Sequence, residues 1–163
     1  EQLHSFALRE RGIFVCLRVL AAVPCFGWVF SRPTVLWGYA LPADTEVLVS
    51  ISETHHMPEL YPDPDAFKPS RWETITPTGY EYNPFSAGPR PCIGAGFAMM
   101  EIKIILAMLL QRYRLQFVPK HPIDRTGVIV MLPRNGLPMQ VNVQDRSFHL
   151  CGGEVRVNVH EMV

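Results

Sequence analysis

Two long apolar segments of the chain predict helices. His4–Ala22 is apolar with charged interruptions and contains no proline, so we expect a helix that ends before Pro24 and is followed by an apolar loop. Ile93–Arg112 is apolar on nearly all sides, with Glu101 and Lys103 as its charged exceptions before the final turn. A helix of this kind is expected to be buried in a body larger than a single helix layer.

Shorter apolar runs bounded by turn residues predict strands. Val35–Ala40 and Thr45–Ser50 are two such runs, separated by Pro42-Ala43-Asp44. Ile51–Tyr61 follows them and predicts one or two short helices. A further strand is expected at Tyr113–Val118.

The last strands are expected to form a hairpin. Gly127–Leu132 and Leu137–Val143 flank Pro133-Arg134-Asn135-Gly136, which is a strong hairpin signal. Before the second long helix, Pro62–Pro91 is rich in proline, glycine, aspartate and aromatic residues and has no clear period. This segment predicts ordered coil, and a loop of that length in a compact domain is usually functional.

Composition and charge narrow the class of protein. The chain has 163 residues, of which 48% are hydrophobic and 18% charged, so it is apolar for a free-standing domain. Its 15 basic and 15 acidic residues cancel, so it has no electrostatic footprint for nucleic acid.

The cysteine pattern excludes several kinds of site. Four cysteines are present without any Cys-x-x-Cys spacing, which argues against a zinc ribbon, a dithiol redox site and a disulfide framework, and favours a reducing compartment. Cys16, Cys25 and Cys151 are interpreted as packing residues.

Cys92 has a different context, because it lies in a proline-stiffened loop directly before the second long helix. Backbone N–H groups at a helix N-terminus favour the thiolate, which makes this cysteine a candidate metal ligand or nucleophile. Gly88 permits a turn that a side chain would forbid, and Gly94 allows a flat group to approach the backbone. Arg90 offers a planar fork suited to a carboxylate or phosphate.

Two motifs together point to a known family. FSAGPRPCIG, residues 85–94, resembles the haem-binding signature of the cytochrome P-450 superfamily, Phe-x-x-Gly-x-Arg-x-Cys-x-Gly. PDPDAFKPSRW, residues 62–72, is similar to the family's meander. The resemblance implies an α+β, mainly helical fold: the C-terminal portion of the cytochrome P-450 fold, with small β-sheets and a long meander and cysteine loop. Residues 1–144 would form this incomplete haem-binding part and residues 145–163 a C-terminal tail.

The resemblance also implies a cofactor and roles for the loop residues. The cofactor would be haem b, bound non-covalently, with the Cys92 thiolate as the axial ligand of its iron. Arg90 would clamp a propionate, Phe85 would shield the sulfur, and Gly88 and Gly94 would shape the loop.

Two residues outside the loop match positions that the family often places near the propionates. Arg32 is one, following the first helical region, and His55 is the other, in THHMPELYPDP. For His55, a propionate contact and a plain surface histidine both remain open.

The first helix departs from the family pattern. The family carries Glu-x-x-Arg on a helix, completed by an arginine of the meander; here Arg18 and Arg71 are present, but Val15 stands at the glutamate position. Two arginines without that carboxylate would leave buried charge uncompensated, and breaking such a network costs about 3–5 kcal/mol. The family's paired prolines after this helix appear here as Ala21-Ala22, and the match to the family improves after about residue 33. This asymmetry leaves a decayed gene copy, a local frameshift and a truncated product open, and full-length members are more than twice as long as this chain.

The resemblance therefore implies a truncated form of a haem-thiolate monooxygenase, similar to soluble bacterial members and located in the cytoplasm. Its substrate would be an apolar small molecule and its electron donor a ferredoxin or flavoprotein reductase, with no nucleic-acid partner and no membrane anchor. No catalytic residue is assigned, because the family's oxygen-activating helix has no counterpart here. The alternative is an inactive remnant or partial haem-binding module. A thiol enzyme using Cys92 would lack a partner base in the motif.

Overall fold

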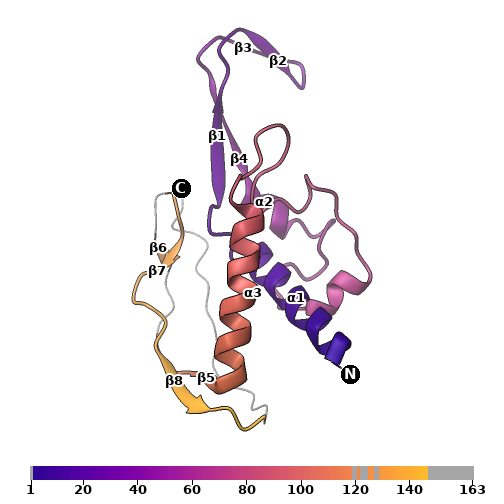
Figure 1. The fold of residues 1–163 in the computed structure, drawn as a ribbon. Helices are drawn as coiled ribbons and strands as arrows, with labels where there is room; N and C mark the ends of the chain where they lie inside the picture. Colours follow the sequence, from indigo (N-terminus) through magenta and orange to yellow (C-terminus); the bar gives the residue numbers. More distant parts are fainter. Residues whose placement is uncertain (1, 119–120, 122–124, 127–128, 147–163) are drawn as a thin grey trace. The chain divides into compact units, whose positions relative to one another are not determined.

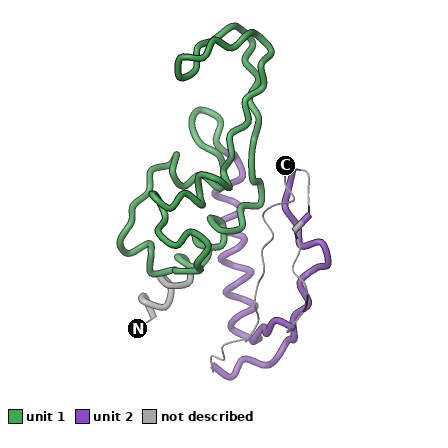
Figure 2. The backbone as a smooth tube through the Cα atoms, turned by 180° about the vertical axis from the view of Figure 1, so that it is seen from behind, with its two compact units in different colours: residues 1–91 green, residues 92–163 purple. Residues whose placement is uncertain are grey.

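The computed structural model describes residues 2–118, 121, 125–126 and 129–146 (Figure 1). Its elements, in chain order, are α1 (Gln2–Val19), β1 (Cys25–Val29), β2 (Thr34–Leu36), β3 (Tyr39–Leu41), β4 (Glu46–Ser50), α2 (Ile51–His56), the 3-10 helix η1 (Pro69–Glu73), α3 (Ala95–Arg112), β5 (Tyr113–Phe117), β6 (Arg125–Thr126), β7 (Leu132–Pro133) and β8 (Met139–Val143). The chain divides into two compact units, Glu1–Pro91 and Cys92–Val163 (Figure 2). Among the described helices, none combines the length and hydropathy needed to cross a lipid bilayer.

The strands of the first unit form a ribbon with a hairpin at its end. β1 pairs antiparallel with β4, with Cys25 opposite Ser50 and Val29 opposite Glu46, and the β2–β3 hairpin lies beyond them (Figure 1). Trp37 and Gly38 connect β2 to β3 with φ angles of 49° and 85°, so the chain reverses within two residues.

Two predictions for this ribbon were wrong. Val35–Ala40 is not one strand, because the two positive φ angles at Trp37-Gly38 break the apolar run into two paired strands. Cys25–Val29 is not an apolar loop but strand β1, which is long enough to pair with all five residues of β4.

The first helix is confirmed, and the ordered coil after α2 contains one 3-10 helix. α1 contacts both α2 and η1. The Oγ atom of Ser50 caps α2 by accepting the Glu53 N–H at 3.1 Å. Met57, which precedes a proline, ends α2 with extended backbone. Proline also stands at the start of η1, where its fixed φ suits the first helical position.

The described residues with the least exposed side chains all lie in the first unit, and the set is unusually polar. It comprises Ile13, Val15, Ala21, Ile51 and Tyr61 together with Arg18, His55, Arg71 and Asn83. Beside it, Phe14, Trp72 and Tyr82 form an edge-on aromatic cluster, with the Trp72 and Tyr82 rings 4.8 Å apart. A core of this kind requires hydrogen-bond partners for its polar groups.

The second unit contains the predicted long helix and the predicted strand after it. β5 follows α3 directly and pairs antiparallel with β8, with Tyr113 opposite Val143 and Phe117 opposite Met139. No side chain of α3 is buried, so the expectation of a buried helix is not met: Phe97 is 64% exposed and Met108 57%.

The predicted C-terminal hairpin has the right turn and the wrong partner. Gly136, at φ 68°, donates its N–H to the Pro133 carbonyl at 3.2 Å, as a turn requires. The strand after the turn, β8, pairs with β5 over all five of its residues, whereas Leu132, at the end of the predicted partner strand, pairs with Thr126. β7 pairs with the two-residue strand β6. The tail expected at residues 145–163 lies almost wholly outside the described residues.

Candidate functional site

Cys92 lies two residues before Gly94, the N-cap of α3. Its thiol is free and exposed, and its carbonyl accepts the Ala95 N–H at 3.2 Å. A Cβ atom at Gly94 would lie 3.8 Å from the Cys92 sulfur, in ordinary van der Waals contact with it. An exposed cysteine sulfur two residues before a helix N-cap is a donor that a metal can reach, so the donor chemistry fits a haem iron.

The residues before Cys92 form a turn that depends on glycine. Gly88 has φ 78°, and a Cβ atom added there would meet nothing within 4 Å. Glycine is therefore needed at position 88 for its backbone conformation, and not because a side chain would collide with its neighbours. Arg90 is exposed and Phe85 is partly buried.

Three side chains of the first unit, those of His55, Tyr61 and Tyr82, form hydrogen bonds that fix the segment before this loop. The backbone N–H of Asn83 donates to Nε2 of His55 at 3.1 Å. The hydroxyl of Tyr61 donates to the Glu81 carbonyl at 2.8 Å, and the hydroxyl of Tyr82 donates to the Phe14 carbonyl at 3.3 Å. The segment that leads into the loop is thus fixed to elements earlier in the chain.

His55 is completely buried, so the interpretation as a surface histidine is wrong. Because its Nε2 accepts the Asn83 N–H, the ring proton resides on Nδ1, which donates to the Arg18 carbonyl at 3.2 Å. Desolvation, with the nearby Arg18 and His56 as smaller causes, lowers the pKa of His55 to about 4. At neutral pH the ring is neutral, and both of its nitrogens are engaged by the backbone.

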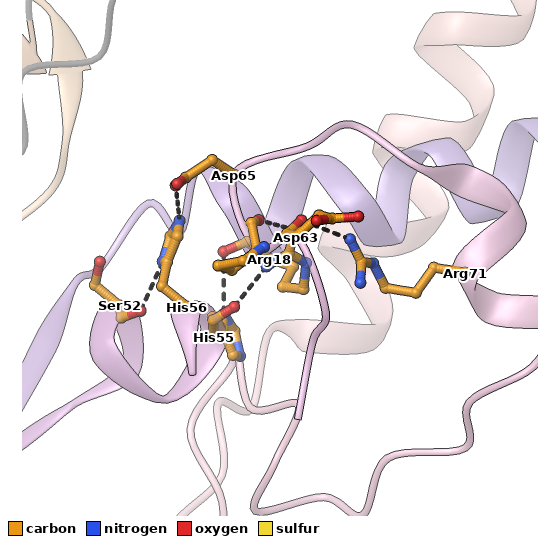
Figure 3. A network of polar contacts seen from close by, with 8 residues as sticks. Arg18, Ser52, His55, His56, Asp63, Asp65 and Arg71 are labelled. Carbon is orange, nitrogen blue, oxygen red and sulfur yellow. Dashed lines mark hydrogen bonds and ion pairs between the residues drawn. The ribbon is translucent and has the colours of Figure 1, made fainter. Parts of the chain in front are cut away.

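The two buried arginines find backbone acceptors in place of a carboxylate (Figure 3). Arg18 donates from Nη1 to the His55 carbonyl at 2.5 Å and from Nη2 to the Pro64 carbonyl. Arg71 donates to the Pro62 carbonyl and, at 2.9 Å, to the Asp63 carbonyl. The expectation that both arginines would be uncompensated is therefore wrong for their Nη atoms, because the meander turns its carbonyl oxygens toward them.

The guanidinium groups of Arg18 and Arg71 are only partly satisfied by these carbonyl oxygens. The Nε atoms of Arg18 and Arg71 are buried without a hydrogen-bond partner, and Val15 is fully buried on α1, three residues before Arg18. Burial, together with the charge of Arg71, lowers the pKa of Arg18.

The remaining predicted residues lie apart from this network. Arg32 is exposed, between β1 and β2. Cys16 and Cys25 are also exposed, so their interpretation as packing residues is wrong. Cys151 lies outside the described residues.

The predicted haem contacts are divided between the two units. The first unit carries five of them, Arg32, His55, Phe85, Gly88 and Arg90, and the second begins at Cys92 and contains Gly94. Sequence reasoning missed Asn83 and Tyr61. A buried tyrosine hydroxyl usually has a partner, but nothing in the sequence identifies Glu81 as that partner.

Comparison with known proteins assigns the family. The cytochrome P450 family profile matches residues 16–140. The chain is 37% identical over 125 residues to cytochrome P450 4V2 of Mus musculus, covering 74% of this chain and 24% of that protein. It is 34% identical over 148 residues to cytochrome P450 4c21 of Blattella germanica, covering 89% of this chain and 29% of that protein. The chain belongs to the cytochrome P450 family, and it spans about a quarter of the length of these relatives.

A solved cytochrome P450 structure supports the same family assignment. The retinoic acid-bound cyanobacterial CYP120A1 is similar with a TM-score of 0.76 and 26% identity, covering 83% of this chain and 33% of that one. Similar proteins thus include animal as well as cyanobacterial members. The family consists of haem-thiolate monooxygenases, whose haem is held non-covalently with its iron bound by a cysteine thiolate.

Proposed function

We propose that this chain supplies the thiolate-bearing part of a haem-thiolate monooxygenase. The single observation that carries the proposal is the exposed Cys92 thiol at the start of α3, after a turn that needs Gly88. The complete enzyme would insert one oxygen atom of O2 into an apolar organic substrate, with electrons from a ferredoxin or flavoprotein reductase.

The loop residues would each have a distinct task. Cys92 would donate its thiolate to the iron, and Arg90 would bind a propionate through its exposed guanidinium. Phe85 would keep water from the sulfur, because an apolar ring beside a thiolate limits solvation. Gly88 would allow the turn, and Gly94 would leave the sulfur accessible.

Arg32 would contribute a second propionate contact from the segment between β1 and β2. Its guanidinium is exposed, which suits an anionic partner. When bound, haem supplies the oxygen activation that protein side chains lack. The contribution of this chain would be to bind the cofactor, orient it and supply the sulfur ligand from Cys92.

A partial haem-binding module without monooxygenase activity is the second candidate. It is favoured by Val15, which is fully buried where family members carry a glutamate. The backbone acceptors of Arg18 and Arg71 weaken this candidate, since they replace part of the missing compensation. The two candidates differ in oxygen-dependent turnover and agree on thiolate ligation.

The test is to fold the chain with haem and record the spectrum of the reduced, carbon monoxide-bound form. We expect a thiolate-type Soret band that Cys92→Ala removes and that Cys16→Ala and Cys25→Ala retain, because all three thiols are exposed and only Cys92 lies directly before α3. A folded wild-type chain without this band would overturn the proposal. A band without substrate oxidation, in the presence of O2 and a reduced ferredoxin, would favour the second candidate.

A further inference from the structure

His55 joins two parts of the chain that are far apart in sequence. Its Nδ1–H donates to the carbonyl of Arg18, 37 residues earlier, at 3.2 Å. Its Nε2 accepts the N–H of Asn83, 28 residues later, at 3.1 Å. A single imidazole therefore connects helix α1 to the segment that leads into the cysteine loop.

The orientation of the ring is fixed by its neighbours. The Tyr82 ring stacks on it at 5.5 Å between centroids and 20° between planes. The Tyr61 ring meets it edge-on at 6.4 Å and 80°. His55 and Tyr61 have no exposed surface, so the imidazole has little freedom to turn away from either hydrogen bond.

Asn83 is bonded on both sides of its backbone. Its N–H donates to His55, and its carbonyl accepts the Ser86 N–H at 2.9 Å. Ser86 has φ 64°, so this turn directs the chain toward the left-handed residue Gly88. The contact with His55 thus lies at the origin of the turn from which the chain runs to Cys92.

We propose that His55 is a positioning residue for the thiolate ligand: it touches backbone and not cofactor, and it fixes Asn83 and hence the turn that opens the cysteine loop. This proposal rests on the proposed function. It differs from the propionate contact implied by the family resemblance, because the hydrogen bonds to Arg18 and Asn83 use both ring nitrogens.

Two substitutions by amide residues can each preserve one hydrogen bond of His55 and remove the other. An asparagine amide lies about where Nδ1 does and can donate to the Arg18 carbonyl, but it is too short to reach Asn83. A glutamine amide lies about where Nε2 does and its oxygen can accept the Asn83 N–H. If the Asn83 bond matters for the ligand, His55→Gln should preserve it and His55→Asn should not.

His56→Gln is the matched control. His56 is the adjacent residue, but its Nδ1 bonds to the Ser52 carbonyl at 2.7 Å and its Nε2 lies 3.7 Å from Asp65 (Figure 3). The substitution His56→Gln therefore removes a histidine from the same helix and leaves the hydrogen bond to Asn83 in place.

The experiment uses the full chain in all four forms and two readouts. The first is hydrogen exchange of the Asn83 amide in the haem-free chain. The second is the fraction of thiolate-type Soret band after haem addition, reduction and carbon monoxide binding. We expect His55→Asn to speed Asn83 exchange about five-fold or more and to lose most of the band. We expect His55→Gln and His56→Gln to match the wild type in both readouts.

Two results would overturn the inference. One is a band that is unchanged in His55→Asn although Asn83 exchange has become faster. The other is an equal loss of the band in His55→Gln and His55→Asn, which would indicate a packing role. A loss of the band in folded His55→Gln is sufficient for this conclusion, even if His55→Asn fails to fold. A folded wild-type chain without the band would instead refute the proposed function. The proposed role of His55 in ligation would then fail as well.

Discussion

Arg18 and His55 exchange hydrogen bonds, each side chain donating to the backbone carbonyl of the other. The guanidinium bond is 2.5 Å long and the imidazole bond 3.2 Å (Figure 3). The guanidinium also lies over the Tyr61 ring, 4.9 Å from its centre. This reciprocal pair ties α1 to the end of α2, so a change in either residue affects both helices.

Arg18→Met should destabilise the chain by about 2–4 kcal/mol, because the buried carbonyls of His55 and Pro64 would lose their charged donor. The measurement is the free energy of unfolding in urea. Arg11→Met is the control, since Arg11 on the same helix makes an exposed ion pair with Glu73 and should cost less than about 1 kcal/mol. Equal losses in the two variants would show that the carbonyl bonds of Arg18 contribute little.

Val15→Glu should be more stable than its neutral counterpart Val15→Gln by about 1–3 kcal/mol at pH 7. Position 15 shares a face of α1 with Arg18, and two buried Nε atoms lack a partner. A carboxylate stabilised by these arginines has a lowered pKa, so the advantage should be complete above about pH 5 and fall as the pH drops through 4. Urea unfolding of both variants at pH 7 and pH 4 measures it. A less stable glutamate variant at pH 7 would mean that desolvation exceeds the attraction.

Acid should destabilise the chain through His55. Its pKa in the folded state is about 4, whereas an unfolded histidine has its ordinary value of about 6.5, so the unfolded state binds the proton first. The stability that the neutral ring provides is complete above about pH 6.5 and is lost as the pH falls to about 4, a change of about 3 kcal/mol.

The matched comparison is the unfolding free energy of the wild type and His55→Gln from pH 7 to pH 4. Between pH 7 and pH 4 the wild type should lose about 3 kcal/mol relative to His55→Gln, because glutamine does not titrate. The Tyr61 and Tyr82 rings that contact His55 stay neutral over this range, because burial raises the pKa of both hydroxyls. A difference that stays constant over this range would refute the assignment of a neutral His55.

Gly88→Ala should cost about 1–2 kcal/mol, because an alanine at φ 78° is strained although the space around it is open. Gly79→Ala is the control: Gly79 also has open space and has no positive φ, so the change should be neutral or slightly stabilising. Urea unfolding and the thiolate-type Soret band measure the two effects. An unstrained Gly88→Ala variant with a normal band would show that the left-handed turn is unnecessary.

The sequence predicted those features that depend on local pattern. The long helix α3 follows from a mostly apolar segment, strand β5 was predicted directly after it, and Cys92 with Gly88 follows from a motif. Strand partners were not predictable in the same way, because the turn at Pro133–Gly136 fixes a reversal without choosing which strand β8 will meet.

The network around His55 was not predictable for a related reason. Its two bonds span 37 and 28 residues and end on backbone atoms, which carry no side-chain signature. The absent glutamate at Val15 pointed to unpaired charge, but the sequence could not show that meander carbonyls approach Arg18 and Arg71. Buried polar groups find partners through tertiary geometry, and that geometry is set by the whole unit.

The exposure of Cys16, Cys25 and Cys92 has a consequence for the handling of this protein. Accessible sulfur oxidises in air, so a preparation kept without reductant will accumulate cross-linked copies and sulfenic acid. Replacing Cys16, Cys25 and Cys151 with serine would leave Cys92 as the single cysteine of the sequence, available for selective chemical labelling.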